Sequence, residues 1–177
     1  MKKTSIYRKI FMKPSKIQVL KAKKALFLFP GFRALTWKGI AYCKNKYDIQ
    51  LINFEDKISS DFEAHEMTHV KQAESTHNLW FCFYALYLWY WIINFPLFIT
   101  GVLYMPYFFI PFELEAMNNE TNWGYPTNGA VYQWKEFNKK LSLSKKYKLA
   151  KEYKKVRKEV GFKQFVRTVI FPMINED

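Results

Sequence analysis

A long uncharged segment dominates the hydropathy pattern of this chain. No Asp, Glu, Lys, Arg or His occurs from Asn78 to Phe112, and Pro96 divides this run into the apolar halves Leu79–Phe95 and Leu97–Ile110. Each half is about as long as the shortest membrane span, and the Trp and Tyr residues scattered through both suit a membrane interface. We therefore expect a hydrophobic helical hairpin over residues 79–111. A helical hairpin buried in a protein core or in an oligomer would give the same pattern.

A segment of helical period lies directly before this run. Ser60 and Glu63 have the spacing of a capping box, with Ser60 at the N-cap and Glu63 at N3. Apolar residues then recur at helical spacing at Ala64, Met67, Val70 and Ala73. The pattern predicts a helix that begins near Asp61.

Two stretches of strand composition precede the predicted helix. Leu35–Cys43 and Ile49–Phe54 are rich in β-branched and aromatic residues, and we expect a turn between them near Lys44–Lys46. Residues 1–33 alternate basic and apolar side chains. They form a basic amphipathic segment that suits either an anionic membrane surface or a solvated helix packed on the domain.

The charge balance changes the picture of possible partners. The chain has 28 Lys and Arg against 15 Asp and Glu, a formal net charge of +13, and hydrophobic residues make up 50% of it. Basic residues concentrate in the N-terminal segment and in predicted helices over residues 130–170. This combination favours membrane lipid as a partner, and the absence of a nucleic-acid recognition motif disfavours nucleic acid. With 177 residues, we expect a single domain over 1–177.

The candidate chemistry lies in the predicted helix, where His65, Glu66 and His69 form the pattern H-E-x-x-H. Positions i and i+4 share one face of a helix, so the two imidazoles can bind one Zn²⁺ ion. Glu66 can take a proton from water at the metal and pass it to a leaving amine. The same pattern also arises by chance in plain helices, so the downstream residues must decide.

An acidic stretch after the apolar segment supplies that context through Pro111, Phe112, Glu113, Glu115 and Ala116. The order H-E-x-x-H and then E-x-x-A on a second helix resembles the gluzincin type of zinc metallopeptidase. It more distantly resembles membrane zinc endopeptidases of the HtpX and CAAX-processing kind. The strings H-E-x-x-H-V-x-Q and P-F-E-x-E-A are also similar to small uncharacterised bacterial and phage proteins. The resemblance covers residues 60–120.

The resemblance implies roles for several further residues. Glu113 would be the third zinc ligand, with Glu115 as the alternative. The family pattern places an Asp where this chain has Met117, so Asn118 becomes the candidate for holding a ligand histidine. Tyr125 and Tyr132 are the candidates for stabilising the oxyanion of a tetrahedral intermediate.

Together these features predict a mostly α, α+β fold of zincin-like type. A short β-hairpin or small sheet would precede the H-E-x-x-H helix, and the hydrophobic hairpin would be inserted before the third-ligand helix. The predicted function is a membrane-associated zinc metallopeptidase that acts on a peptide or protein substrate. A metal ion shared by residues on both sides of the apolar segment requires that segment to return to the side it left, and the positive-inside bias places the site in the cytoplasm. The alternative is a non-enzymatic membrane-associated or virion structural protein with a zinc-stabilised or degenerate zincin core.

Overall fold

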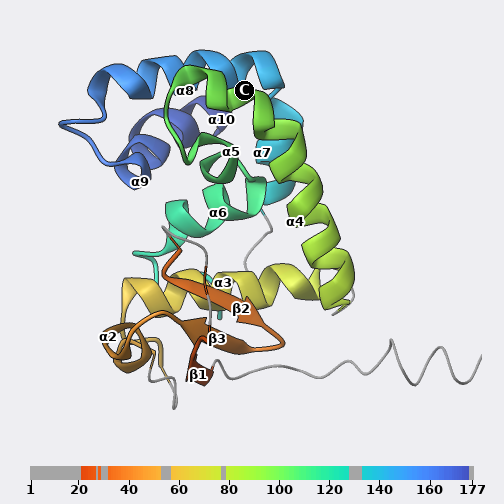
Figure 1. The fold of residues 1–177 in the computed structure, drawn as a ribbon, viewed down its shortest axis with the longest axis vertical. Helices are drawn as coiled ribbons and strands as arrows, with labels where there is room; N and C mark the ends of the chain where they lie inside the picture. Colours follow the sequence, from red (N-terminus) through yellow and green to blue (C-terminus); the bar gives the residue numbers. More distant parts are fainter. Residues whose placement is uncertain are drawn as a thin grey trace, which may run out of the picture. The chain divides into compact units, whose positions relative to one another are not determined.

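In a computed structural model, the protein is a mostly helical α+β structure in which a small sheet is followed by helices (Figure 1). This confirms the fold class predicted from the sequence. The structure describes residues 21–26, 28, 32–52, 57–76, 79–127 and 133–175. The chain divides into two units, one of residues 1–84 and 119–130, the other of residues 85–118 and 131–177.

A three-stranded sheet belongs to the first unit. Its strands are β1 (Lys21–Lys24), β2 (Ala34–Trp37) and β3 (Ile40–Cys43), in the order β1-β3-β2. β3 pairs parallel to β1 and antiparallel to β2. Lys38 and Gly39, between β2 and β3, have φ values of 49° and 74°, and a two-residue type I′ hairpin turn requires positive φ at both positions. The single strand predicted over Leu35–Cys43 is therefore wrong, because the chain folds back at Gly39.

The second predicted strand, Ile49–Phe54, is also wrong over the part that is described. Ile49 belongs to helix α2 (Lys46–Gln50). The side chain of Asn45 accepts the N–H of Asp48 at 2.8 Å, so the polar residues expected to form a turn instead cap a helix. The third strand, β1, comes from the N-terminal basic segment, of which residues 1–20 lie outside the described residues.

Helix α3 (Asp61–Glu74) begins where the capping pattern predicted. The hydroxyl of Ser60 accepts the N–H of Glu63 at 3.1 Å. The carboxylate of Glu63 accepts from the N–H and hydroxyl of Ser59, at 2.7 and 2.9 Å, one residue earlier than a capping box requires. The predicted apolar positions of the helix are buried. The apolar side of α3 is therefore buried in the protein.

The uncharged segment forms one long and one short helical limb. Its elements are α4 (Trp80–Asn94), the 3₁₀-helix η1 (Phe95–Thr100) and α5 (Met105–Phe108). Pro96 lies in the first turn of η1, where its missing N–H breaks no helical hydrogen bond. The chain instead turns at Gly101, whose φ is 74°. Asn94 Nδ2 donates to the carbonyl of Pro106 at 3.1 Å, which ties the returning limb to the first.

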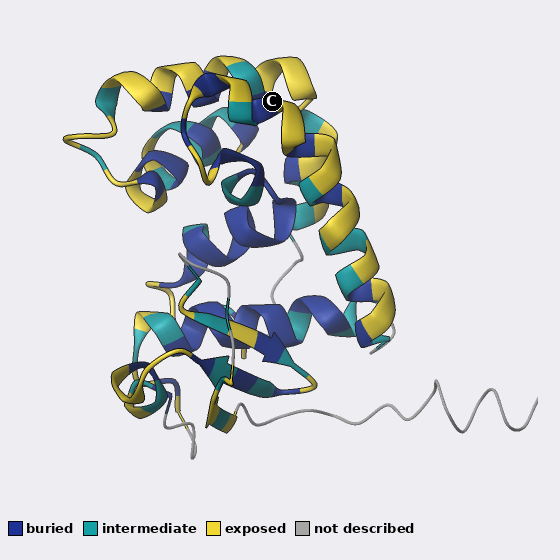
Figure 2. Cartoon of the chain, in the orientation of Figure 1, coloured by how far each residue is buried: buried dark blue, intermediate teal, exposed yellow. Residues whose placement is uncertain are grey.

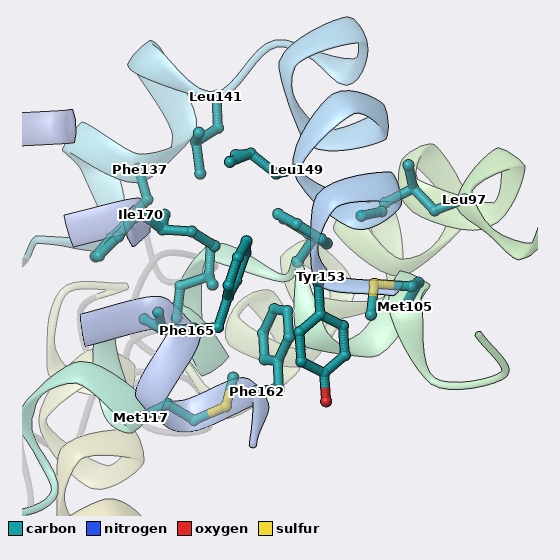
Figure 3. Close-up of a cluster of buried hydrophobic side chains, with 14 of the residues drawn as sticks. Leu97, Met105, Met117, Phe137, Leu141, Leu149, Tyr153, Phe162, Phe165 and Ile170 are labelled. Atoms are coloured by element: carbon teal, nitrogen blue, oxygen red, sulfur yellow. The ribbon is translucent and has the colours of Figure 1, made fainter. Parts of the chain in front are cut away.

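The remaining helices surround the apolar core of the second unit (Figure 3). They are α6 (Pro111–Asn119), α7 (Trp134–Lys140), α8 (Leu143–Val156), α9 (Phe162–Phe165), the π-helix η2 (Val166–Ile170) and α10 (Phe171–Asn175). Phe137, Phe165 and Ile170 are almost fully buried in this core, and Leu97 of η1 packs into the same cluster. The C-terminal helices therefore give the apolar segment a protein surface to pack against.

Candidate metal centre

The structure brings together three side chains that can hold a metal ion. His65 and His69 of α3 and Glu113 of α6 each offer one ligand atom, and these atoms lie within 4.8 Å of one another. The three residues are only 8%, 7% and 2% exposed. Ligand atoms around a tetrahedral zinc ion lie about 3.3 Å apart, from metal–ligand distances near 2.05 Å. The group is therefore consistent with the predicted H-E-x-x-H…E type of site.

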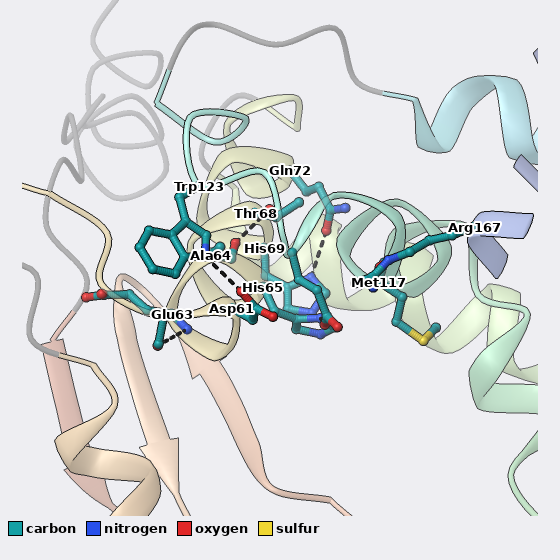
Figure 4. Close-up of polar contacts among 12 residues, drawn as sticks. Asp61, Glu63, Ala64, His65, Thr68, His69, Gln72, Met117, Trp123 and Arg167 are labelled. Carbon is teal, nitrogen blue, oxygen red and sulfur yellow. Dashed lines mark hydrogen bonds and ion pairs between the residues drawn. The ribbon is translucent and has the colours of Figure 1, made fainter. Parts of the chain in front are cut away.

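His69 is oriented by a neighbour on its own helix. The rings of His65 and His69 have centroids 5.0 Å apart and planes at 86°. The Nδ1 atom of His69 lies 2.8 Å from Oε1 of Gln72, as the dashed line in Figure 4 shows. Because an amide oxygen only accepts, Nδ1 of His69 carries the proton of this hydrogen bond, and in the neutral ring Nε2 is then the nitrogen with the lone pair.

His65 is oriented by a carboxylate that the sequence analysis missed. The Nδ1 atom of His65 lies 3.2 Å from Oε2 of Glu120, which is buried. An ionised carboxylate only accepts, so Nδ1 is the nitrogen of His65 that carries the proton of this hydrogen bond. The family pattern expects the carboxylate that holds a ligand histidine at position 117, one helical turn after Glu113. Glu120 lies seven residues after Glu113, directly after the last residue of α6, and this spacing of about two helical turns could have identified it.

Glu66, the predicted general base, is held by the sheet of the first unit. Its Oε2 accepts the hydroxyl of Thr36, on strand β2, at 2.6 Å. The carbonyl of Thr36 in turn accepts the hydroxyl of Tyr84. Thr36 and Glu66 are both buried. The carboxylate is therefore fixed by one oxygen in a largely dehydrated position.

The thiol of Cys43, on the adjacent strand β3, is not a second reactive group. Burial raises the pKa of this thiol to about 12, and the charges of Glu66 and Asp48 add to the increase while Arg33 opposes it. Only the thiolate is nucleophilic, so Cys43 stays protonated and inert at neutral pH.

In the second unit, Glu113 and its alternative Glu115 have different partners. Oε1 of Glu113 accepts the hydroxyl of Tyr87, on α4, at 2.6 Å. The ring of Tyr87 stacks on Phe112 with planes at 9°. Oε1 of Glu115 instead accepts the backbone N–H of Gln133 at 2.8 Å. Among the described residues, His65, His69 and Glu113 form the one group that could hold a metal ion, here called the metal-competent group, and Glu115 is not part of it.

The remaining site candidates from the sequence are Asn118, Tyr125 and Tyr132. Asn118 donates to Oε1 of Gln133 at 3.5 Å, whereas Gln72 and Glu120 are the residues bonded to the ligand histidines. Tyr125 lies in the turn of residues 121–127, where its N–H bonds the carbonyl of Asn122 at 2.9 Å. Tyr132 lies outside the described residues.

Comparisons with known proteins identify no family for this chain. No protein-family model, no curated protein and no solved structure matches the chain. The functional conclusion therefore depends on the residues of the site and their chemistry.

Proposed function

We propose that the protein is a zinc-dependent metallopeptidase that hydrolyses peptide bonds. The observation that carries this proposal is the buried group of His65, His69 and Glu113, whose ligand atoms lie within 4.8 Å of one another and whose two imidazoles each have Nδ1 beside an acceptor oxygen. Structural zinc sites usually have four protein ligands, whereas catalytic sites have three and keep one position for water. Two imidazoles and one carboxylate form such a three-ligand set.

The donor atoms suit zinc better than the common hard cations. Mg²⁺ and Ca²⁺ prefer oxygen ligands, whereas imidazole nitrogen suits Zn²⁺. The carboxylate of Glu120 beside Nδ1 of His65 also makes that imidazole a stronger ligand. When bound, a zinc ion supplies the Lewis acid that activates water and polarises the scissile carbonyl.

Glu66 supplies the proton transfers in this proposal. Its carboxylate accepts a proton from the attacking water and delivers it to the leaving amine. The hydroxyl of Thr36 holds Oε2 at 2.6 Å, which leaves Oε1 to exchange the proton. Tyr125 and Tyr132 remain the candidates for donating a hydrogen bond to the oxyanion. Burial of Glu66 keeps bulk water from competing for these contacts.

Metal content of the purified protein, measured by mass spectrometry, tests the ligand set. We expect near-stoichiometric zinc in the wild type and its loss in His69→Ala and Glu113→Gln. Glu115→Gln is the matched control, because it makes the same isosteric change two residues away and should keep zinc. Zinc lost in Glu115→Gln but retained in Glu113→Gln would contradict the assignment.

Cleavage of an internally quenched peptide library tests the chemistry. Glu66→Gln should retain zinc and lower the rate of cleavage by about 10²–10⁴-fold, the usual contribution of a general base. The peptidase function would be refuted if no peptide or membrane protein is cleaved by the zinc-loaded wild type and left uncut by Glu66→Gln. That result would leave the metal site intact.

A second candidate is a non-enzymatic membrane-associated or virion structural protein with a zinc-stabilised core. The bond from Thr36 to Glu66 supports it, because this bond gives the carboxylate a structural role. In that case zinc removal lowers the thermal stability, but Glu66→Gln leaves the biological role of the protein intact. Loss of that role in Glu66→Gln, with fold and zinc preserved, would exclude this candidate.

A further inference from the structure

The apolar segment of the second unit has one buried and one exposed side along its length (Figure 2). The buried side includes Tyr90, Asn94, Leu97 and Thr100. Six large apolar residues, each between 51% and 78% exposed, recur at near-helical spacing on the other side and are here called the apolar face: Leu88, Trp89, Ile92, Phe95, Ile99 and Leu103. Large apolar side chains exposed along one side of a segment are typical of interaction surfaces.

We propose that the apolar face docks onto an anionic phospholipid bilayer, with α4 and η1 lying in the plane of the membrane surface. Residues Trp80–Thr100 form a helical stretch that is long and apolar enough to cross a membrane by length and composition. The contacts of the same segment favour docking in the plane over crossing.

Basic residues border the apolar face within the same unit. α8 packs against η1, and Nζ of Lys154 lies 3.2 Å from the position that a Cβ at Gly101 would occupy. Lys151 lies on the same flank of α8, with Nζ 4.6 Å from the ring centroid of Tyr147. The sequence of α8 contains six Lys and one Glu. Lysines beside an apolar surface complement anionic lipid headgroups, which favours a bilayer over a neutral protein partner.

An apolar hollow lies where the apolar face meets α8. It has a volume of about 390 Å³ and is lined by Pro96, Leu97, Ile99, Leu143, Ser144 and Tyr147. Carbon atoms dominate this lining, so the hollow suits a lipid acyl chain better than a polar ligand. Ile99 belongs to both the hollow and the apolar face, and the two surfaces are therefore continuous.

Asn94 and Lys146 argue against an orientation across the bilayer. Nζ of Lys146 donates to Oδ1 of Asn94 at 2.9 Å on the buried side of the segment, and Asn94 also donates to Pro106. A spanning helix would either break these bonds or bring the lysine into hydrocarbon, where a charged side chain is strongly disfavoured. Docking in the plane keeps both bonds inside the protein.

Flotation of the full-length protein with vesicles tests the surface. We expect binding to vesicles of phosphatidylcholine mixed with phosphatidylglycerol, and much weaker binding to phosphatidylcholine alone. Ile92→Asn and Ile99→Asn should each lower the partition coefficient about tenfold, because each removes one isoleucine from lipid. Lys151→Gln and Lys154→Gln should each lower it about fivefold at low salt, and high salt should remove this difference.

Matched controls come from exposed residues of the first unit. Tyr47→Asn removes an exposed apolar side chain, and Lys44→Gln with Lys46→Gln removes two exposed lysines. These variants should bind like the wild type. Unchanged binding in folded Ile92→Asn and Ile99→Asn, or an equal loss in the controls, would overturn the proposal. A wild-type dimer that Ile99→Asn dissociates, with no binding to either vesicle, would identify a second copy as the occupant and would also overturn it.

Membrane depth separates docking in the plane from crossing. A fluorophore on Ile99→Cys, in a Cys82→Ser background, should be quenched by probes near the headgroups of the vesicle. Stronger quenching by probes at the bilayer centre would show a crossing orientation and overturn the in-plane arrangement. None of these substitutions touches the metal-competent group, so a failure here leaves the proposed function standing.

Discussion

Lys146 is a lysine in the interior of the second unit, and replacing it with methionine tests its environment. It is only 4% exposed, and its Nζ donates to Asn94 Oδ1 at 2.9 Å. Burial lowers the pKa of this amine from 10.5 to about 8. At neutral pH the folded protein therefore keeps a cation in a poorly hydrated position, and Lys146→Met removes that cost.

The pH dependence of the free energy of unfolding follows from this shift. Between pH 8 and 10.5 the unfolded chain binds a proton that the folded chain does not, so the stability rises with pH through this window. The difference between the two pKa values corresponds to about 3 kcal/mol. Lys146→Met also leaves Oδ1 of Asn94 without its donor, which costs about 1–3 kcal/mol. The net change at neutral pH is therefore small, and the pH dependence is the decisive quantity.

Urea unfolding at a series of pH values measures this difference. The stability of the wild type relative to Lys146→Met should rise by about 3 kcal/mol from below pH 8 to pH 10.5. Lys145→Met, at the exposed neighbouring position, should follow the wild type throughout. The subtraction also cancels Cys43, which is common to both proteins. If the difference in free energy of unfolding between the wild type and Lys146→Met does not change with pH, burial does not lower the pKa of Lys146.

Three further predictions follow from contacts in the structure. Gln72→Leu and Glu120→Gln should each weaken zinc binding about 10–100-fold without abolishing it, measured by competition with a chelator; unchanged affinity would mean that neither residue orients its histidine. Because the thiol pKa of Cys43 is raised from 9.0 to about 12, its stabilising contribution is complete below pH 9 and is lost as the pH rises toward 12. Urea unfolding of the wild type and Cys43→Ala should show this loss only in the wild type, and alkylation of the native protein should modify exposed Cys82 first. Gly101→Ala should destabilise the protein by about 1–2 kcal/mol in the same assay, since φ there is 74°; a neutral result would contradict the left-handed turn.

Helix α3 and its histidine pair could be predicted from the sequence because their signals are local. The Ser60 cap and the i, i+4 spacing of His65 and His69 depend only on residues within a few turns of one another. The strands were less predictable, since a continuous run of strand-forming residues hid the turn at Gly39. Asn is common both in turns and at helix N-caps, so the sequence alone did not distinguish these roles for Asn45. In the structure its side chain accepts the N–H of Asp48 and caps α2.

The partners of the site residues could not be predicted, because they depend on how distant segments pack. Thr36 lies thirty residues before Glu66 in the chain, and Tyr87 lies twenty-six residues before Glu113. Neither pair has a spacing that distinguishes it from an ordinary core contact. Glu120 was missed for a different reason, because the expected position of the histidine partner was taken one helical turn too early.

Helix α4 contributes both to the apolar face and, through the hydrogen bond from Tyr87 to Glu113, to the metal-competent group. The helix bears part of the apolar face, and its Tyr87 hydroxyl also contacts a carboxylate of the metal-competent group. If α4 docks on a bilayer as proposed, this hydrogen bond connects the docked helix directly to Glu113. Thermodynamic linkage then sets a strict condition: the factor by which a bilayer changes the affinity for metal equals the factor by which metal changes the affinity for the bilayer. If both proposals hold and this factor differs from one, adding a bilayer should change the metal affinity of the protein, and adding metal should change its partition onto the bilayer by the same factor.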